Sequence, residues 1–348
     1  MRILYIVPSL IQAGPVNVVL DLVNVMQGHG HLCEVAYMED RNDRAHNVFP
    51  CRVFKIINGE SVEWQRYDVV HSHGLKPDLY VRRHGRKYRK RVRFVSTMHN
   101  YVFRELRIMR GPVRALLQGS LVLFAAKSHH RIITLLESAR KYYSRWLPEK
   151  KLRVCCNTRI FALSDCDAED VKSFSDLRKN VRYIIGTNCS IHRRKNLNQV
   201  VEALPMMPKV GFVIVGDGVE MEALRAQAER LGVSNRVLFL GRRPSAYRYI
   251  PHYDLFVIPS RSEGFPLGLL EAAALGKASA SSDIDAFKDT FEETEVPRFK
   301  LDDPADLARV VTDALVRREE LGRRIKARFE RDYSPEAFYE QHIKVYTD

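Results

Sequence analysis

Short apolar segments rich in β-branched residues alternate with longer helical patterns along most of the chain. A continuous apolar run of four to six residues is typical of a strand that is buried on both faces of a parallel sheet. Alternation of such strands with helices predicts parallel sheets covered by helices on both sides. The predicted strands are Ile3–Val7, Asp68–Ser72, Phe94–Met98, Arg131–Leu135, Arg153–Cys156, Val181–Gly186, Gly211–Val215, Val237–Leu240 and Leu255–Pro259. The predicted helices between them are Val16–Gln27, Pro112–Ala126, Ser138–Trp146, Asn196–Leu204, Val219–Leu231 and Leu267–Leu275.

One interruption of this alternation predicts a domain boundary. Residues 157–179 are polar, acidic and rich in serine, and a new strand pattern begins at Val181. A chain of 348 residues is also longer than one hydrophobic core usually supports. We therefore predict two doubly wound α/β domains, at 1–160 and 180–332, joined by a linker at 161–179. Ser334, Pro335 and Glu336 offer an N-cap, a first-turn proline and a first-turn acid, which predict a last helix, Pro335–Val345, within residues 333–348.

The net charge of +14 is concentrated in the first part of the chain. Residues 1–150 carry 25 Lys and Arg against 12 Asp and Glu, a net charge of +13, whereas residues 151–348 are close to neutral. This asymmetry suggests different partners for the two halves. The densest run is Arg82–Arg93, with eight Lys and Arg in twelve residues.

The basic run allows three interpretations. It could be a solvated charged surface, or a nucleic-acid site that neutralises phosphates, although no nucleic-acid motif accompanies it. The third interpretation is an anionic membrane surface, to which each Lys or Arg adds about 1 kcal/mol of binding free energy. The amphipathic, Arg-flanked segment 112–127 favours the membrane, so no nucleic-acid partner is predicted. The candidate membrane-binding residues are Arg82, Arg83, Arg86, Lys87, Arg89, Lys90 and Arg91.

Neither end of the chain nor its cysteines predict secretion. The N-terminus enters a strand pattern at once, and the longest apolar stretch, near 115–126, is shorter than the roughly 20 residues of a membrane span. The six cysteines have no CxxC spacing, which favours small buried side chains in a reducing compartment. We expect a cytoplasmic protein that is peripheral at the inner face of the plasma membrane.

Two loops after predicted N-terminal strands are candidate ligand sites, because ligands of doubly wound sheets bind beyond the carboxyl ends of the strands. Gly14 lies between the first strand and its helix, where backbone N–H groups and the helix dipole attract anions. The loop lacks the GxGxxG pattern, and an ordinary βα loop is the alternative. His99 follows the strand Phe94–Met98, with a structural histidine as the alternative. His71 and His73 are weaker candidates, and since no nearby carboxylate or cysteine completes a ligand set, no metal site is predicted.

Three cations precede a predicted helix in the C-terminal half. Arg193, Arg194 and Lys195 lie just before Asn196–Leu204, where positive charge opposes the helix dipole. A bound phosphate would resolve this conflict, because Arg offers forked donors and Lys a point charge. A solvated basic loop is the alternative. Gly216, Asp217 and Gly218 on their own predict only a sharp turn after a strand.

Two glutamates flank another predicted helix start. Glu263 lies on a loop and Glu271 on the helix that follows, and the helix start supplies N–H groups between Phe265 and Gly268, Pro266 excepted. A carboxylate can accept hydrogen bonds from two neighbouring hydroxyls of a ribose or hexose. The arrangement is what a nucleotide-sugar site would need, and one helix cap with one surface charge is the alternative.

Together these residues resemble a known enzyme family. Glu263–Glu271 resembles the E-x7-E motif of retaining glycosyltransferases of family 4, which have the GT-B fold. The segments that are also similar to the family are Tyr253–Ser260, Ala274–Lys277, Val213–Gly218, Arg194–Leu197, Thr97–Asn100, Val154–Asn157 and Gly14. The resemblance implies two Rossmann-like domains facing a cleft, an N-terminal domain that binds the acceptor, a C-terminal domain that binds the nucleotide-sugar, and a C-terminal helix that crosses back to the N-terminal domain.

The resemblance also implies a role for each matching position. Glu263 would face the donor sugar and His99 the reacting carbon, as catalytic residues, and Glu271 would bind the ribose. Lys195, with Arg193 or Arg194 beside it, would neutralise the diphosphate. The other implied donor-binding residues are Gly14, Gly216, Asp217, Gly218, Arg243, Gly264, Phe265, Pro266 and Leu267.

The chain departs from the family's pattern in three places. Gly186 is followed by Thr187-Asn188 and a longer loop where the family usually has Gly-Arg, and Asn157 is followed by Thr158 instead of Gly. Pro266 stands at a usual glycine and removes one N–H donor, whereas Leu267 still offers one. The first departure leaves open whether Arg193 or Arg194 is the second diphosphate cation.

The resemblance predicts a retaining hexosyltransferase whose donor is a nucleotide-sugar, with a UDP-sugar favoured over a GDP-sugar. The expected acceptor is a lipid-linked glycan of bacterial surface-polysaccharide assembly. Fixed cations and helix N-termini can stabilise a leaving diphosphate, so we expect activity without a metal ion or cofactor. The alternatives are a GT-B sugar-nucleotide epimerase and a non-catalytic polyanion- or membrane-binding module. The binding module has no need of Glu263, Glu271 and Lys195.

Overall fold

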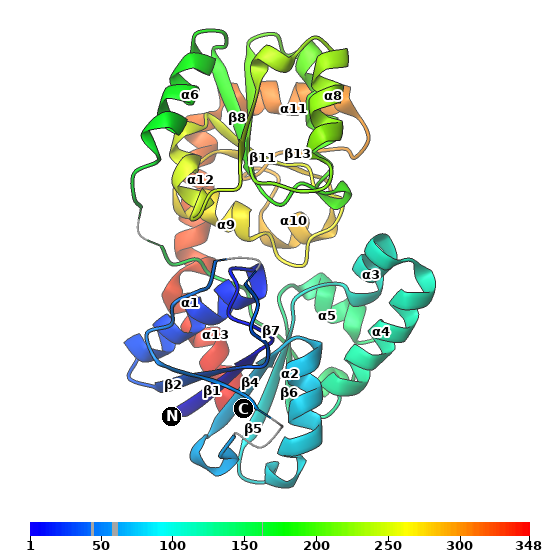
Figure 1. Ribbon diagram of the computed structural model, residues 1–348, viewed down its shortest axis with the longest axis vertical. Coiled ribbons are helices and arrows are strands. Elements are labelled where there is room, and N and C mark those ends of the chain that lie inside the picture. The colour runs from blue at the N-terminus through cyan, green and yellow to red at the C-terminus, as the bar shows by residue number, and fades with distance from the viewer. Residues whose placement is uncertain (43–44, 58–61, 162) are drawn as a thin grey trace. The chain divides into compact units, whose positions relative to one another are not determined.

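The computed structural model describes residues 1–42, 45–57, 62–161 and 163–348, and the chain divides into two units, each built on its own parallel sheet (Figure 1). Met1–Ile160 and Tyr333–Asp348 form unit 1, and Phe161–Asp332 form unit 2. The predicted parallel α/β architecture is therefore confirmed. From the sequence, unit 1 carries 29 Lys and Arg against 15 Asp and Glu and unit 2 carries 27 of each, so the whole net charge of +14 lies on unit 1.

The sheet of unit 1 has the spatial order β3-β2-β1-β4-β5-β6-β7, and all its strand pairs are parallel. Its strands are β1 (Arg2–Val7), β2 (Leu32–Tyr37), β3 (Arg52–Lys55), β4 (Val69–His73), β5 (Arg93–Met98), β6 (Arg131–Thr134) and β7 (Leu152–Val154). The chain moves outward from β1 to β3 and then crosses back to β4. The switch between β1 and β4 is the place where open α/β sheets bind ligands.

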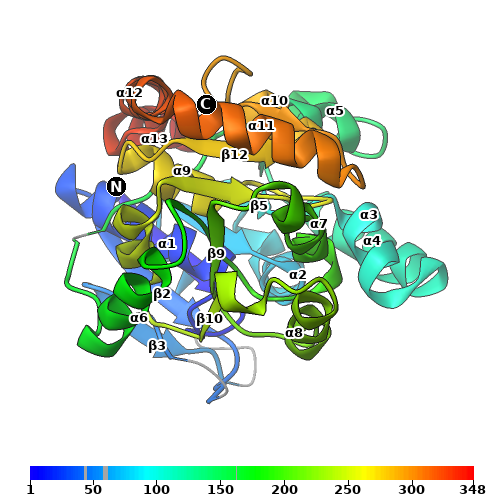
Figure 2. The same ribbon diagram turned by 90° about the horizontal axis from the view of Figure 1, so that it is seen from above.

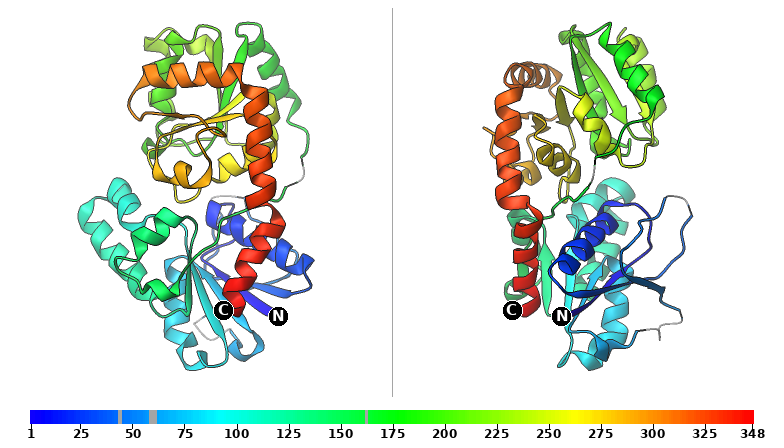
Figure 3. Two further views of the ribbon diagram at one scale, coloured as in Figure 1. Left: turned by 180° about the vertical axis from the view of Figure 1, so that it is seen from behind. Right: turned by 90° about the vertical axis from the view of Figure 1, so that its left-hand side faces the viewer.

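Helices cover both faces of this sheet. They are α1 (Gly14–Gly28), α2 (Leu75–Tyr80), α3 (Val102–Arg110), α4 (Pro112–Ala126), α5 (Glu137–Tyr143) and α13 (Pro335–Thr347). On one face Leu4 and Phe94 pack with Trp64 and with Tyr80 of α2. On the other face α1 lies beside α13, the red helix of Figure 3, whose Tyr346 contacts His71.

The last helix begins as the sequence predicts. The hydroxyl of Ser334 accepts a hydrogen bond from the backbone N–H of Ala337, and Pro335 occupies the first turn. Aromatic contacts then hold α13 on unit 1, since Tyr339 stacks on His29 with ring centroids 3.6 Å apart. The chain thus returns from unit 2 to unit 1, as the GT-B resemblance implies.

Unit 2 contains a second parallel sheet, with the spatial order β10-β9-β8-β11-β12-β13. Its strands are β8 (Tyr183–Asn188), β9 (Val210–Val215), β10 (Val237–Gly241), β11 (Leu255–Ile258), β12 (Ser279–Ser282) and β13 (Arg298–Phe299). The chain moves outward from β8 to β10 and then crosses back to β11, so the switch of this sheet lies between β8 and β11.

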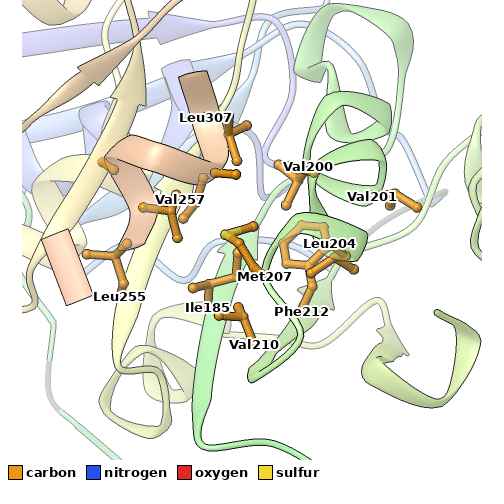
Figure 4. Close-up of a cluster of buried hydrophobic side chains, with 14 of the residues drawn as sticks. Ile185, Val200, Val201, Leu204, Met207, Val210, Phe212, Leu255, Val257 and Leu307 are labelled. Atoms are coloured by element: carbon orange, nitrogen blue, oxygen red, sulfur yellow. The ribbon is translucent and has the colours of Figure 1, made fainter. Parts of the chain in front are cut away.

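The helices of unit 2 are α6 (Ala168–Arg178), α7 (Leu197–Ala203), α8 (Met221–Arg230), α9 (Leu267–Ala274), α10 (Asp285–Thr290), α11 (Pro304–Val316) and α12 (Arg318–Arg328). Figure 2 shows α7 and α8 on one side of β9 and α6 on the other. Leu204, Phe212 and Leu307 belong to one buried cluster that joins α7 and α11 to the central strands (Figure 4). Within the part of the chain that the structure describes, no helix is long and apolar enough to cross a membrane.

Several elements differ from the sequence predictions. The patterns missed the strands β2, β3, β12 and β13 and the helices α2, α3, α6, α10, α11 and α12. Strand β12 has the sequence SASS, in which buried serines replace the apolar run that signals a strand. The stretch 161–179, predicted as a linker, contains α6 and belongs to unit 2, because Phe174 and Leu177 are buried there.

A buried carboxyl group in unit 1 gives a pH-dependent stability. Asp78 of α2 accepts hydrogen bonds from Ser72 Oγ at 2.6 Å and Ser96 Oγ at 2.9 Å, and burial raises the pKa of Asp78 to about 7. Because folding raises the pKa of this carboxyl group, its protonated form stabilises the folded protein at low pH. The contribution is complete below the pKa that Asp78 has in the unfolded chain, and it is lost as the pH rises toward 7.

We therefore expect Asp78→Asn to gain stability relative to the wild type as the pH rises. The relative gain in unfolding free energy between pH 5 and pH 8 is about 2–3 kcal/mol. Urea unfolding at the two pH values measures it. A difference between variant and wild type that stays constant with pH contradicts the raised pKa.

Candidate active site

The predicted diphosphate-binding residues lie at the switch of the unit 2 sheet. Arg193, Arg194 and Lys195 form a short 3-10 turn after β8, and Glu263 lies on the loop after β11. Because β8 and β11 are neighbours with parallel directions, the loops after their carboxyl ends meet at one edge of the sheet. The sequence placed these residues 68 positions apart along the chain, and the fold brings them into contact.

Glu263 forms ion pairs with two of the three cations. Its Oε1 lies 2.6 Å from Lys195 Nζ, and its Oε2 lies 3.3 Å from Arg194 Nη1. Burial alone would raise the pKa of Glu263, but the charges of Lys195 and Arg194 outweigh it and hold that pKa below its ordinary value. The carboxylate therefore stays ionised at neutral pH. Of the two arginines, Arg194 contacts Glu263 and Arg193 is exposed.

Hydrogen bonds fix the two loops against each other. Arg194 Nη1 donates to the carbonyl oxygen of Ser262 at 2.7 Å, and the N–H of Arg261 donates to the carbonyl oxygen of Arg194 at 2.8 Å. The Arg261 guanidinium also holds both carboxylate oxygens of Asp302. These bonds keep the cations and Glu263 in place without a bound ligand.

A buried glutamine of α7 holds the same loops in place through hydrogen bonds. Gln199 of α7 accepts hydrogen bonds from Asn196 Nδ2 at 2.7 Å and from the N–H of Asp302 at 3.1 Å, and it donates to the carbonyl oxygen of Lys300 at 2.7 Å. Asn196, which ends the 3-10 turn, has a φ of 54°, a left-handed conformation that Asn tolerates better than most residues. Sequence reasoning missed Gln199, because only the fold shows what lies next to it.

The glycine pair after β9 allows a close approach of two loops. A Cβ atom on Gly216 would lie 1.8 Å from the carbonyl oxygen of Cys189, and one on Gly218 would lie 2.0 Å from that of Ile191. Gly216 also has a φ of +153°, and the N–H of Ile191 donates to the carbonyl oxygen of Asp217 at 2.9 Å. The two glycines thus pack the loop after β9 onto the loop that leads to Arg194 and Lys195.

The start of α9 differs in one detail from the sequence prediction. Pro266 precedes the helix and lacks an N–H, as expected, but the N–H of Leu267 donates to the carbonyl oxygen of Phe265 at 3.0 Å and is not free for an anion. Gly264 and Phe265 complete the turn between Glu263 and the helix. Glu271 lies on α9 and is half-buried.

Arg243 has a structural partner that the sequence did not reveal. Its Nε and Nη2 atoms form a fork on the Asp170 carboxylate of α6, at 2.7 and 2.9 Å, and Tyr249 donates to the same carboxylate at 2.6 Å. The ion pair keeps the pKa of Asp170 below its ordinary value. Arg243 thus fixes α6 to the loop after β10.

In unit 1 the predicted residues follow the carboxyl ends of strands. Gly14 is the first residue of α1, after β1, and His99 follows β5. His99 Nε2 lies 2.9 Å from Nδ1 of His73, which the sequence rated only as a weaker candidate. Burial lowers the pKa of His99 to about 4, so its imidazole is neutral at physiological pH. The region that the structure describes holds no group of three or more His, Cys, Asp or Glu side chains that could bind a metal ion.

The basic run lies away from His99. Arg82, Arg83, Arg86, Lys87, Arg89, Lys90 and Arg91 occupy the turns between α2 and the first residue of β5, Arg93. His99 follows the last residue of the same strand, Met98. The fold therefore places the basic run and His99 at opposite ends of β5. Gly14 lies at the same edge of the sheet as His99.

Comparisons with known proteins show that the chain is similar to glycosyltransferases. Residues 169–331 match the family described as glycosyl transferases group 1. The chain is 27% identical to an O-antigen biosynthesis glycosyltransferase, WclY, of Escherichia coli, over 100% of this chain and 98% of that protein. It is 28% identical, over 64% of this chain and 59% of the relative, to the E. coli UDP-Gal:alpha-D-GlcNAc-diphosphoundecaprenol alpha-1,3-galactosyltransferase. The crystal structure of Anabaena HepE in complex with UDP is similar with a TM-score of 0.79, at 17% identity and over 100% of both chains, which shows a shared GT-B fold.

Proposed function

The chain is a glycosyltransferase with a group 1 glycosyl transferase domain at residues 169–331, and from this premise we propose that it is a retaining family 4 enzyme. In this proposal it transfers a hexose from a UDP-sugar to a lipid-linked glycan in the assembly of a bacterial surface polysaccharide. It acts in the cytoplasm, at the inner face of the plasma membrane.

The contact of Glu263 with Lys195 and Arg194 carries the proposal for the donor. The cluster at the switch of the sheet contains two cations and one carboxylate, and all three side chains are largely buried and fixed in place. Its net charge is therefore positive. A diphosphate brings the negative charge that this cluster lacks, and it competes with Glu263 for both cations. The carboxylate released in this way faces the sugar ring, where positive charge develops in the transition state.

Lys195 and Arg194 also supply what the departing diphosphate requires. Charge on the leaving group is stabilised by preorganised donors, so the proposed reaction needs neither a metal ion nor a cofactor. The acceptor hydroxyl attacks from the face that the diphosphate leaves, and a diphosphate oxygen takes its proton. Neutral His99 lies near the reacting carbon as a hydrogen-bonding group.

The relatives support the proposed acceptor class. The name of one similar protein specifies a diphosphoundecaprenol acceptor, and the name of another specifies O-antigen biosynthesis. The excess positive charge of unit 1, the unit that would receive the acceptor, favours a partner with phosphate groups.

The experiment that tests the proposal is a transfer assay with a defined acceptor. Purified enzyme is incubated with UDP-[14C]sugars and short-chain polyprenyl-diphosphate glycans, with EDTA in one series and Mg²⁺ in the other. We expect a labelled lipid whose new linkage keeps the donor's anomeric configuration by NMR, at equal rates in both series. An inverted linkage, strict Mg²⁺ dependence or conversion of the donor to an epimer contradicts the proposal.

The two glutamates should affect different kinetic constants. Glu271→Ala removes charged hydrogen bonds to the ribose, and we expect the KM for the donor to rise about 10- to 100-fold with a smaller change in kcat. Glu263→Ala removes charge stabilisation in the transition state, and we expect kcat to fall about 100-fold. Steady-state kinetics with varied donor separate the effects. Normal constants in both variants refute the assignment.

A further inference from the structure

Helix α4 presents an apolar face that the fold of unit 1 leaves uncovered. Five large apolar side chains of α4 are between 41% and 70% exposed. They recur at intervals of one to four residues and are Val113, Leu116, Leu117, Leu121 and Phe124. These positions share one side of a helix, and we call them the α4 ridge. The opposite side of α4 is buried, with Gly119 packed on the ring of Phe103 of α3. Contiguous exposed apolar patches of this kind mark interaction surfaces.

A cavity lined by positive charge lies at one end of the ridge. It has a volume of about 220 Å³, several times the roughly 30 Å³ of a water molecule. Four cations line it, Arg82, Arg86, Arg89 and Lys127, and no carboxylate is among the lining residues. We call these four residues the cation pocket. Its composition suits a phosphate group, because Arg offers forked donors to phosphate oxygens.

The ridge and the pocket form one continuous surface. The guanidinium carbon of Arg82 lies 3.6 Å from the centroid of the Phe124 ring, and Arg82 Nη1 donates to the carbonyl oxygen of Phe124 at 3.1 Å. Lys127 immediately follows α4. The last apolar residue of the ridge thus touches the first cation of the pocket, and their relative positions are fixed by a cation–π contact and a hydrogen bond.

Charge on the neighbouring segment matches the same partner. Residues 102–127 carry five Lys and Arg and a single acid, Glu105, which is buried. An acidic protein would satisfy the cations, but it would leave most of the apolar ridge in water. An anionic bilayer satisfies both parts, because its phosphates and its acyl chains lie within one helix diameter of each other.

We propose that the α4 ridge and the cation pocket together dock unit 1 on an anionic membrane, with the ridge in the acyl boundary and a phospholipid phosphate in the pocket. This inference rests on the proposed function, which puts the acceptor in the membrane, and it identifies the surface that reaches it. Of the basic run that the sequence singled out, only Arg82, Arg86 and Arg89 belong to the pocket. Lys127 and the ridge come from a segment about 40 residues further along the chain.

Vesicle flotation of the full chain tests the proposal with paired variants. The vesicles contain phosphatidylcholine alone or phosphatidylcholine with about 40% phosphatidylglycerol, which gives a surface rich in anionic lipid. Leu116→Ser/Leu117→Ser changes the ridge, and Val316→Ser/Met206→Ser is its control from exposed apolar residues of unit 2. Arg86→Ala/Arg89→Ala changes the pocket, and Arg230→Ala/Arg323→Ala is its control from exposed arginines.

We expect the wild type and both controls to float with the anionic vesicles and not with the neutral ones. The pocket variant should bind the anionic vesicles about 25-fold more weakly, about five-fold for each lost cation. The ridge variant should lose the part of the binding that persists in 0.5 M NaCl, because salt screens the charges and leaves the apolar contact. Equal flotation of all variants, or flotation on neutral vesicles, overturns the proposal. Release by millimolar inorganic phosphate also overturns it, because a soluble phosphate would then be the ligand.

One further readout separates this inference from the proposed function. Hydrolysis of the UDP-sugar without acceptor involves no residue of the ridge, so the ridge variant should retain it within about two-fold. If flotation fails and hydrolysis proceeds, the docking surface is wrong and the proposed function stands. If flotation succeeds and no nucleotide-sugar is turned over, the proposed function fails and the docking surface stands.

Discussion

Replacing Lys195 by Ala should lower kcat for sugar transfer by about 100- to 1,000-fold, the loss expected when one preorganised charge donor to a developing anion is removed. The structure gives two reasons for the size of the effect. Lys195 Nζ is the nearer cation to Glu263, at 2.6 Å, and the Lys195 side chain is only 16% exposed, which weakens screening of its charge by water. The variant also leaves a buried carboxylate with one cation in place of two, which should raise the pKa of Glu263.

The control for Lys195 is another lysine of unit 2. Lys209 is exposed just before β9, and we expect Lys209→Ala to keep the wild-type kcat. Steady-state kinetics on both variants, with circular dichroism to confirm folding, measure the difference. A Lys195→Ala enzyme with kcat within five-fold of the wild type would remove Lys195 from the mechanism.

Arg194→Ala and Arg193→Ala, compared in the same assay, decide which arginine is the second cation, and we expect the larger loss for Arg194.

The second large effect is expected at Gly218. A Cβ at this position would lie 2.0 Å from the carbonyl oxygen of Ile191 and 2.7 Å from its carbonyl carbon, both backbone atoms that cannot rotate away. The loop after β9 must move by about 1 Å to relieve the overlap, and shifts of that size cost on the order of 100-fold in rate when they reach catalytic groups. Ile191 is four residues before Lys195, so we expect the shift to reach the proposed diphosphate-binding cations. We expect Gly218→Ala to lower kcat/KM for the donor about 100-fold.

Gly28→Ala is the matched control for this substitution. Gly28 ends α1 in unit 1, and apart from its chain neighbours and the backbone of its own helix no atom lies within 4 Å of a Cβ built on it. We expect this variant to keep both kcat/KM and the unfolding temperature of the wild type. Overpacking at Gly218 should lower the free energy of unfolding by about 1–3 kcal/mol, which thermal unfolding detects. Full activity of Gly218→Ala would show that the two loops do not need their close approach.

The sequence predicted the central strands, and it singled out the loops of the proposed donor site, because the signals of both are local. The apolar runs at Ile3–Val7 and Gly211–Val215 are buried on both faces and correspond to β1 and β9. Arg194, Lys195 and Glu263 were singled out by local charge and helix-start patterns, and strand order then brought them together. The structure adds the reason for their contact, which is the switch between β8 and β11.

Features that depend on long-range contacts could not be predicted in the same way. Strand β12 consists of three serines and one alanine, and its burial follows from its neighbours, β11 and β13, and not from its own sequence. The fork between Arg243 and Asp170 joins residues 73 positions apart, and no local pattern indicates it. The sequence did indicate an amphipathic segment at 112–127, but it did not show which apolar residues of α4 are exposed, because an apolar helix face looks the same in the sequence whether it faces a core or a membrane.

The most direct test of the donor site is the release of nucleoside diphosphate from a panel of UDP- and GDP-sugars, in EDTA and without acceptor, by the wild type and by Lys195→Ala. The account predicts that the wild type releases UDP from at least one UDP-sugar and that Lys195→Ala does so about 100-fold more slowly or not at all. Release of UDP at equal rates by both proteins, or no release of either nucleotide by the wild type, would contradict it.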